Sequence, residues 1–398
     1  MPVTIKMETK ITAVRELQHW LRTTLDQECR RKAFIGFDGF IDSIKVPVRQ
    51  KRGALTTYFQ SIKEFADRIA AASGKSGQIE LETQRTKLGG NAPILANTLG
   101  MMGIESFYLG SAGSPDVHPV FADMNNRVKV ISALNPGFSD ALEFADGKII
   151  LSDLEVFNRY NWKYVRDTVG IDWITNAVSE SDLIAFVDWV NMPHTSDIWR
   201  GMFHEVIVPA RRKNFIFLFD LCDPSKKAAA EIIDVLDLIS GFSDNGRVIL
   251  GLNENETIKI WAALQGVDAS QLTGNDVPEV REAGRAIYRR MNIESLLIHP
   301  IDRTIVIERD GMVERQGRLV RKPKVLTGGG DNLNAGFCMG LLNDLRTEQC
   351  MLLGMAASGA YIENGASPDR EDLIAYVGTW IKDIEALTAT SGLLDTSS

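Results

Sequence analysis

Three consecutive glycines, Gly328 to Gly330, run directly into Asp331, and an apolar segment follows. This segment predicts a mostly buried helix over 331–345 with Asp331 as its N-cap residue. Glycines before a helix leave backbone N–H groups without partners, and the helix dipole adds positive charge there, so an anion such as phosphate would bind. A carboxylate beside phosphate is repelled unless it removes a proton from a hydroxyl that attacks the phosphorus. An ordinary glycine turn with an Asp cap explains the same residues equally well.

The composition is that of an ordinary globular protein: 398 residues, 44% hydrophobic and 24% charged, with a formal net charge of -8. An acidic chain disfavours general binding to nucleic acids or anionic membranes. No apolar run approaches the roughly 20 residues of a membrane span, and the charged N-terminal segment does not resemble a signal peptide. The four cysteines are scattered and the five histidines form no metal-binding pattern, so we expect reduced thiols in a cytoplasmic protein.

Strand-like and helix-like segments alternate along most of the chain. The predicted strands cover 33–46, 105–113, 182–189, 214–220, 247–252, 295–300 and 303–311. The predicted helices cover 8–32, 53–72, 226–240, 254–265, 276–291, 331–345, 347–362 and 369–388, with a further helix that follows Gly90 and ends at Gly103. This alternation predicts a parallel sheet with helices on both faces.

Residues 139–155 alternate in character around Asp146-Gly147, which is a β-hairpin signal. A hairpin among strand–helix units predicts a small second sheet that stands off the main one as a lid. The open edges of such a sheet are often capped by a second copy of the chain, so we expect a homodimer through the lid.

Polar residues interrupt two of the predicted elements. Asp38 and Asp42 lie in the first strand, and carboxylates at the C-terminal end of a parallel strand lie where open α/β sheets bind ligands; shaping a turn is the alternative role. Gly89 and Gly90 precede Asn91, and paired glycines serve close packing or let a polar ligand reach the backbone. The NENE segment that begins the helix at 254–265 is an N-cap with first-turn acids or an anchor for Mg²⁺.

The glycine-rich helix start near residue 90, NENE at 253–256 and TGGGD at 327–331 occur in an order that resembles the PfkB (ribokinase-like) carbohydrate kinases. The resemblance runs from about residue 33 to about residue 388. Its most specific part is VLTGGGDNLNAGFCMGLL, from 325 onward, which is similar to the family's DTxGAGD signature and small-residue helix. It implies a three-layer α/β/α fold with a mostly parallel central sheet and a small β-sheet lid. The implied organisation is an N-terminal helical extension over 1–32 and one kinase domain over 33–390, with the lid at about 43–57 and 130–157.

The resemblance also implies a role for each motif. Asp331 is the implied catalytic base, and the anion hole consists of Gly328, Gly329 and Gly330. The residues implied to contact substrate hydroxyls are Asp38, Asp42, Gly89, Gly90 and Asn91, with Asp42 matching the family's sugar-binding aspartate best. The residues implied to bind the nucleotide are Asn253, Glu256, Thr327 and Asn364. Glu256 is also implied to hold Mg²⁺, directly or through water.

Four positions depart from the family pattern. Val325 and Leu326 replace an Asp-Thr pair whose Asp usually contributes to a monovalent-cation site. Ile94 replaces a second Asn, whose sugar contact is missing or supplied elsewhere, for example by Asn97. IHPIDRT at 298–304 stands in place of the T-x-G-x-x-G nucleotide loop. FDLCDPS at 219–225 is similar to the family's D-x-N strand end with Asp223 for Asn.

The leading hypothesis is therefore a sugar kinase that uses Mg²⁺ and transfers a phosphoryl group from ATP to a hydroxyl of a carbohydrate or carbohydrate-like substrate. ADP remains an alternative donor, because superfamily members that use ADP also have N-x-x-E and G-x-G-D elements, and a nucleoside remains an alternative acceptor. The departures motivate a second hypothesis, a catalytically weak or silent ligand-binding relative. A dinucleotide-dependent enzyme has a similar architecture, but no G-x-G-x-x-G follows the first strand.

Overall fold

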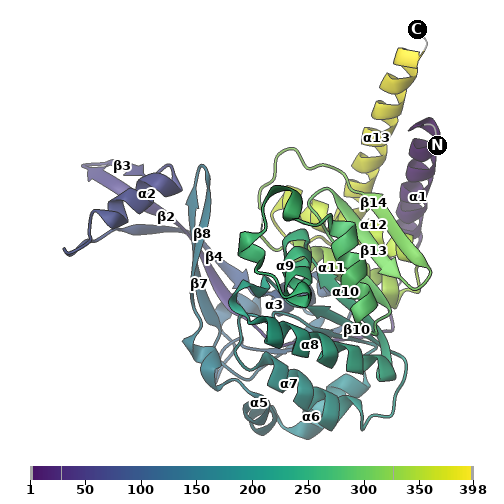
Figure 1. The fold of residues 1–398 in the computed structure, drawn as a ribbon, viewed down its shortest axis with the longest axis horizontal. Coiled ribbons are helices and arrows are strands. Elements are labelled where there is room, and N and C mark those ends of the chain that lie inside the picture. The colour runs from purple at the N-terminus through teal and green to yellow at the C-terminus, as the bar shows by residue number, and fades with distance from the viewer. Residues whose placement is uncertain (1–2, 28, 326, 396–398) are drawn as a thin grey trace.

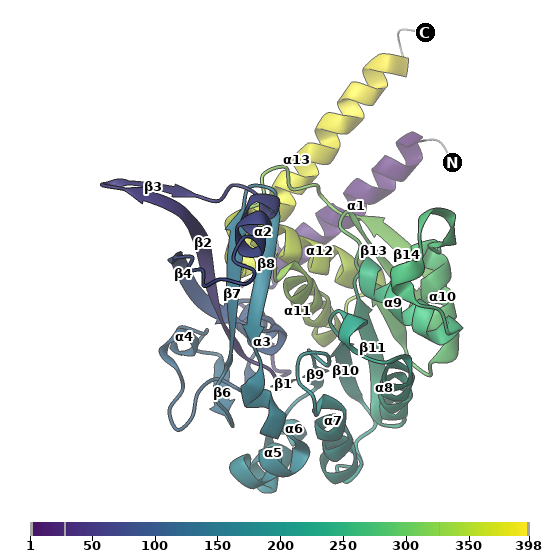
Figure 2. The same ribbon diagram turned by 60° about the vertical axis from the view of Figure 1, so that its left-hand side comes forward.

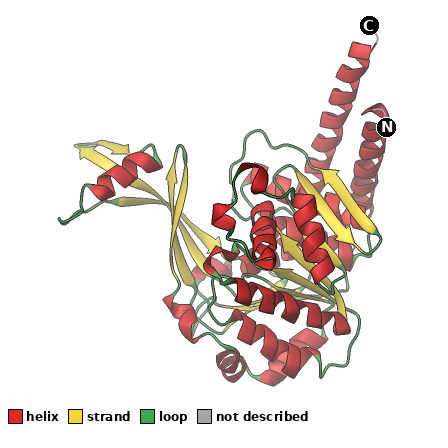
Figure 3. Ribbon diagram, in the orientation of Figure 1, coloured by secondary structure: helices red, strands yellow, loops and turns green. Residues whose placement is uncertain are grey.

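The computed structural model describes residues 3–27, 29–325 and 327–395. Within them, a nine-stranded sheet with helices on both faces forms the body, and a second sheet of five strands projects from one side (Figures 1 and 3). The strand order of the large sheet is β14-β13-β12-β11-β10-β9-β1-β5-β6. All pairs from β12 to β6 are parallel, whereas β13 and β14 pair antiparallel at one edge. The predicted α/β class with a mostly parallel central sheet is confirmed.

The parallel strands of the large sheet are short and apolar, as expected of strands covered on both faces. They are β1 (Ala33–Gly36), β5 (Ser106–Gly110), β6 (Val128–Ser132), β9 (Leu183–Phe186), β10 (Phe215–Asp220), β11 (Gly246–Leu252) and β12 (Ser295–Ile298). The antiparallel edge consists of β13 (Arg303–Glu308) and β14 (Gly311–Gln316).

Two groups of helices cover the two faces of this sheet and form two separate hydrophobic cores. The first group is α1 (Val3–Thr23), α3 (Asn91–Met101), α11 (Gly329–Leu342), α12 (Thr347–Asn364) and α13 (Arg370–Asp395). The second group is α5 (Trp162–Val169), α6 (Ile171–Ser179), α7 (Thr195–Met202), α8 (Ala229–Gly241), α9 (Glu254–Gln265) and α10 (Val280–Arg290). A short helix, α4 (Pro119–Ala122), lies between β5 and β6. Helices α1 and α13 run side by side and extend beyond the body (Figures 1 and 2).

The second sheet, here called the lid sheet, has a long central strand. This strand, β2 (Phe40–Arg52), pairs antiparallel with β3 (Leu55–Tyr58) and β4 (Leu81–Gly89), and parallel with β7 (Gly137–Phe144). The hairpin between β7 and β8 (Gly147–Asp153) confirms the predicted one. Helix α2 (Ile62–Ala70) covers the outer end, where Phe59, Phe65 and Leu142 form a small core.

Several predicted boundaries are wrong. Residues 33–46 form two strands rather than one, because the chain turns at 37–39 and leaves the body for the lid sheet. The helix predicted over 53–72 is β3 followed by α2, whose N-cap is Ser61. Strands β4 and β6 and helices α4 to α7 are absent from the predicted elements, and β6, which overlaps the predicted lid segment 130–157, belongs to the large sheet. Helix α1 ends at Thr23 instead of continuing to residue 32.

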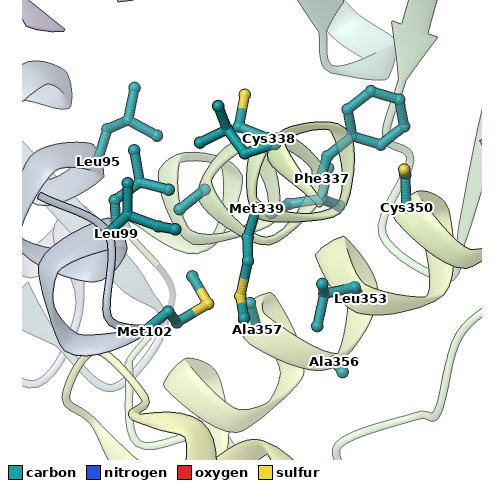
Figure 4. Close-up of a cluster of buried hydrophobic side chains, with 14 of the residues drawn as sticks. Leu95, Leu99, Met102, Phe337, Cys338, Met339, Cys350, Leu353, Ala356 and Ala357 are labelled. Carbon is teal, nitrogen blue, oxygen red and sulfur yellow. The ribbon is translucent and has the colours of Figure 1, made fainter. Parts of the chain in front are cut away.

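Close contact between α11 and α12 fixes the position of α11 in the first core (Figure 4). A Cβ atom built on Gly336 would lie 2.6 Å from the Leu353 carbonyl oxygen and 2.8 Å from the Gly354 Cα. Both distances are shorter than real Cβ contacts, so the two helix backbones can approach this closely only because residue 336 has no side chain.

No described helix is long and apolar enough to cross a membrane.

We therefore expect Gly336→Ala to destabilise the protein by about 1–3 kcal/mol, because the added methyl group forces the two helices apart. Gly241→Ala is the matched control, since the nearest heavy atom to its new Cβ would be the Phe203 Cζ at 3.8 Å. That substitution should be neutral or stabilise by up to about 1 kcal/mol. Urea unfolding measures both values, and equal stability of the two variants would contradict the packing argument.

Candidate functional site

Polar residues gather where the C-terminal ends of the parallel strands meet the N-termini of three helices. Those at the strand ends, all buried, are Asp38 after β1, Asp188 after β9 and Asp220 at the end of β10. Those at the helix N-termini, also buried, are Glu256 on α9 and Asp331 on α11. This edge is where open α/β sheets bind ligands.

The N-terminus of α11 is built differently from the prediction. Gly328, not Asp331, is the N-cap residue, with φ of 89° in the left-handed region, and Asp331 is the third residue of the helix. The helix begins earlier because glycine adopts that backbone conformation without strain. The Tyr361 hydroxyl donates to the Thr327 carbonyl oxygen at 2.9 Å and holds the preceding turn. The first amides of α11 have no acceptor within the helix, which leaves them available to an anion.

Asp331 is 8% exposed, and its Oδ1 accepts a hydrogen bond from the Asn91 Nδ2 at 2.8 Å. Burial raises its pKa well above the usual value, and the nearby carboxylates of Asp220 and Asp38 raise it further. A carboxylate with a raised pKa is a stronger base than an exposed one.

The two aspartates of the first predicted strand lie in different environments. Asp38 is fully buried, and its two oxygens accept from the backbone N–H groups of Asn91 (2.7 Å) and Ala92 (2.8 Å) at the start of α3. Asp42 lies on β2 in the lid sheet and is partly exposed. A Cβ atom on Gly89 would lie 2.3 Å from the Asp42 Cγ, so the glycine makes room for this carboxylate. This arrangement favours Asp42 over Asp38 as a ligand for substrate.

The structure places Cys222 in the site, whereas the sequence comparison had selected Asp223. Asp223 caps a turn and pairs with the Lys259 Nζ at 2.8 Å. The Cys222 Sγ donates to the Asn91 Oδ1 at 3.3 Å, which orients the amide so that its nitrogen faces Asp331. Burial raises the thiol pKa well above its usual value, and Asp188 adds to the shift, so Cys222 stays protonated and can donate. The D-x-N spacing from Asp220 could have identified Cys222.

Asn253 and Glu256 form a capping box, as one of the two sequence interpretations stated. The Glu256 carboxylate accepts from the Asn253 backbone N–H at 2.8 Å and from its Nδ2 at 2.6 Å. Burial raises the pKa of Glu256 to about 8, and Asp220 contributes to the shift. The same pair therefore caps α9 and presents a carboxylate toward Asp220.

His299 lies beside the proposed anion hole. A Cβ atom on Gly330 would lie 3.1 Å from the His299 Cε1. The His299 Nε2 is buried and makes no hydrogen bond within the described residues. Burial lowers its pKa, which keeps the ring neutral. From the sequence, His299 before Pro300 is interpreted as a strand-end residue, with the lining of a nucleotide pocket as the alternative. Its position beside Gly330 allows it to contact a group bound at α11.

The remaining predicted residues are more peripheral. Thr327 and Asn364 are exposed, near the start of α11 and at the end of α12 respectively. The Asn97 Oδ1 accepts from the Asn125 backbone N–H at 2.8 Å, so this oxygen is used inside the fold. Leu326, one of the departures from the family pattern, lies outside the described residues.

Comparison with known proteins identifies the family. The fold is that of the ribokinase-like PfkB carbohydrate kinases. A model of the prokaryotic ketohexokinase family matches residues 7–380, and the chain belongs to this family. It is thus a sugar kinase, a phosphotransferase with an alcohol group as acceptor, and the family implies ATP as co-substrate.

Individual relatives are distant but cover nearly the whole chain. The chain is 24% identical to a ketohexokinase of Haloferax volcanii over 89% of this chain and 93% of that one. A ribokinase from Thermotoga maritima is similar in structure, with a TM-score of 0.57, 16% identity and coverage of 87% of this chain and 99% of that one. The structure of an Arabidopsis thaliana ribokinase in complex with ribose and ATP is also similar, with a TM-score of 0.59 and 13% identity. The match covers 88% of this chain and 99% of that one.

Asp188 generates a prediction about pH. It is fully buried, its Oδ1 accepts from the Asn191 Nδ2 at 2.8 Å, and its Oδ2 has no partner among the described residues. Burial raises its pKa to about 6. Because the folded state binds the proton more tightly, this group stabilises the fold below the pKa of the unfolded chain, and the contribution is lost as the pH rises through 6.

We expect Asp188→Asn to remove this dependence. Relative to the variant, the wild-type protein should lose about 2 kcal/mol of stability between pH 4 and pH 7. Urea unfolding at several pH values measures the difference, and a difference that does not change with pH would show that Asp188 remains ionised throughout.

Proposed function

We propose that this sugar kinase phosphorylates a hydroxyl of a ketose with ATP, and that Asp331 is the general base. The observation that carries the proposal is the buried Asp331 carboxylate in the first turn of α11, beside backbone amides that lack helical acceptors. The family description and the name of the Haloferax volcanii relative support a ketose as the acceptor.

In the proposed reaction, Asp42, Asn91 and the backbone at Gly89-Gly90 hold the sugar so that one hydroxyl faces Asp331. Asp331 takes the hydroxyl proton while the oxygen attacks the γ-phosphorus. The bond from that phosphorus to the bridging oxygen of the donor breaks, and ADP leaves with the electron pair. The Gly328–Gly330 amides stabilise the charge of the transferred group. The chemistry needs positioning and charge neutralisation more than covalent help.

We propose that Mg²⁺ accompanies the nucleotide and is held near Glu256 through water. The two oxygens of Glu256 already accept bonds from Asn253 but retain free lone pairs, which suits contact through water. No group of three or more His, Cys, Asp or Glu side chains in the described ranges is arranged to hold a metal. This fits an ion that takes most of its ligands from phosphate and water. Bound there, Mg²⁺ would neutralise phosphate charge, while Asn253, Thr327 and Asn364 contact the nucleotide.

We also propose the domain organisation that the sequence implies, a 1–32 extension and one kinase domain over 33–390. Within that domain, we propose that the lid sheet excludes water from the reacting groups. Phe138 and Leu151 lie on the lid face opposite Asp42 and are 53% and 56% exposed. A second copy of the chain would cover this apolar face in a homodimer. Sedimentation velocity distinguishes a dimer from a monomer.

A cytoplasmic location is part of the proposal. All four cysteines, which lie in the described ranges, are free. Free thiols fit a reducing compartment.

The substrate and donor are tested with one activity panel. Ketoses, aldoses and nucleosides are each combined with ATP or ADP, with Mg²⁺ or with EDTA. We expect turnover with a ketose, ATP and Mg²⁺, and its loss with EDTA. Turnover only with ADP would show that ADP, not ATP, is the phosphate donor. Turnover only with nucleosides would show that a nucleoside, not a ketose, is the acceptor. Tight sugar binding without any turnover would favour a silent ligand-binding relative, for which Ile94 and the changed 298–304 segment are the motivation.

Asp331→Asn tests the base. The variant should lose at least about 10²–10⁴-fold in kcat, because the amide cannot accept the proton, while it keeps its fold and its affinity for nucleotide. Asp344→Asn is the matched control, since Asp344 lies just beyond the other end of α11 and pairs on the surface with Arg31 at 2.8 Å. Steady-state kinetics, circular dichroism and nucleotide titration measure the outcome. Near-normal turnover of Asp331→Asn would exclude Asp331 as the base.

A further inference from the structure

Lys87 is a partly buried cation without a partner. It lies on β4, two residues before the Gly89-Gly90 pair, and its ammonium group makes no hydrogen bond or ion pair with any described residue. Burial lowers its pKa, and the charge of the Asp42 carboxylate on the neighbouring strand offsets only part of that shift without forming an ion pair. Keeping such a group in the fold costs stability, so a ligand that supplies the missing charge would explain it.

Four other lid cations differ from Lys87, because each has a carboxylate within ion-pair distance. They are Lys45 with Asp140 at 2.7 Å, Arg49 with Glu64 at 2.7 Å, Lys51 with Glu80 at 2.5 Å and Lys148 with Glu143 at 3.4 Å. Arg85, two residues before Lys87 and therefore on the same face of β4, also has no partner in the described residues. Lys87 and Arg85, which make no hydrogen bond or ion pair with a described residue, therefore lie on the same face of β4.

That face is directed toward the reacting groups. Lys87 is the cross-strand partner of Asp42, so the two side chains project from the same side of the lid sheet. The charges that act on Lys87 include Asp42 and Asp331, and those that act on Tyr361, beside Gly328, include Arg85 and Asp42. Figure 2 shows β4 running from the lid sheet toward the start of α3. The β4 cations therefore lie on the lid side of the site whose other side is the N-terminus of α11.

A neutral sugar does not supply the charge that Lys87 lacks, whereas the phosphoryl group in transit does. Its negative charge is spread over three oxygens and moves toward Asp331, a second negative group. The α11 amides can contact this group from the body side only. A cation on the lid side would balance the remaining charge when the lid is in place.

We propose that Lys87 is a further catalytic residue, which contacts the transferred phosphoryl group from the lid side while the α11 amides contact it from the body side. Arg85 supports the same charge from farther out. This inference rests on the proposed phosphoryl transfer at Asp331 and adds the residue that completes the neutralisation of charge.

Lys87→Met tests the proposal, because methionine keeps the apolar stem and removes the charge. We expect kcat to fall about 10²-fold or more, with the sugar KM and the affinity for ADP changed less than about threefold. Lys87→Arg should recover most of the lost activity. Lys45→Met is the matched control, since Lys45 is on the neighbouring strand but on the opposite face, and it should leave kcat unchanged.

A binding measurement separates this role from a structural one. Sugar with ADP and aluminium fluoride, which imitates the phosphoryl group in transit, should raise the Tm of the wild-type protein above the value with sugar and ADP alone. The Lys87→Met variant should lose this additional rise in Tm and keep the rise that sugar and ADP alone produce. An unchanged kcat and increment in Lys87→Met would overturn the proposal. So would a raised sugar KM at unchanged kcat, because Lys87 would then only support Asp42.

Failure of the underlying reaction gives a different result. If Asp331→Asn keeps full turnover, the proposed base is wrong, while a loss of kcat confined to Lys87→Met would still identify Lys87 as a phosphoryl contact. If the wild-type protein gains no Tm from aluminium fluoride and turns over none of the sugars, both proposals fail together.

Discussion

The site depends on one constraint: several carboxylates are buried close together, and Asp38, Glu256 and Asp331 must be stabilised without an ion pair to any described cation. Asp38 accepts the first amides of α3, Glu256 lies in the first turn of α9, and Asp331 lies in the first turn of α11. Each therefore lies at the positive end of a helix dipole, which offsets part of the cost of removing a charge from water. The compensation is partial, since burial still raises the pKa of all three.

The same constraint explains why the helices must meet so accurately. The bond from Asn91 to Asp331 joins the starts of α3 and α11. A second contact joins the Thr98 hydroxyl, farther along α3, to the Oδ1 of Asn332, the residue after Asp331, at 2.9 Å. Close packing of α11 on α12, which Gly336 permits, prevents α11 from moving away from α3. A small displacement of α11 would separate the Asp331 carboxylate from the Asn91 amide on α3 that hydrogen-bonds to it.

The sequence predicted the body of the protein well because buried parallel strands and their helices carry strong apolar patterns. The segment around Asp331 was identifiable for the same reason, since its glycines and its apolar helix are both local signals. Its N-cap was misplaced by three residues because either Gly or Asp can begin a helix, and only the backbone conformation of Gly328 decides between them. Cys222 was missed because a thiol is not a usual substitute for an amide, although its spacing from Asp220 was available.

The lid was harder to predict, for a physical reason. Strand β4 is almost entirely polar between Glu82 and Lys87, so it lacks the apolar alternation by which strands are identified. It needs none, because hydrogen bonds to β2 hold it and one of its faces borders the site rather than a core. A strand made of polar residues lacks the pattern that would reveal it as a strand. Because this strand carries Lys87 and Arg85, the role proposed for these cations can be argued only from coordinates.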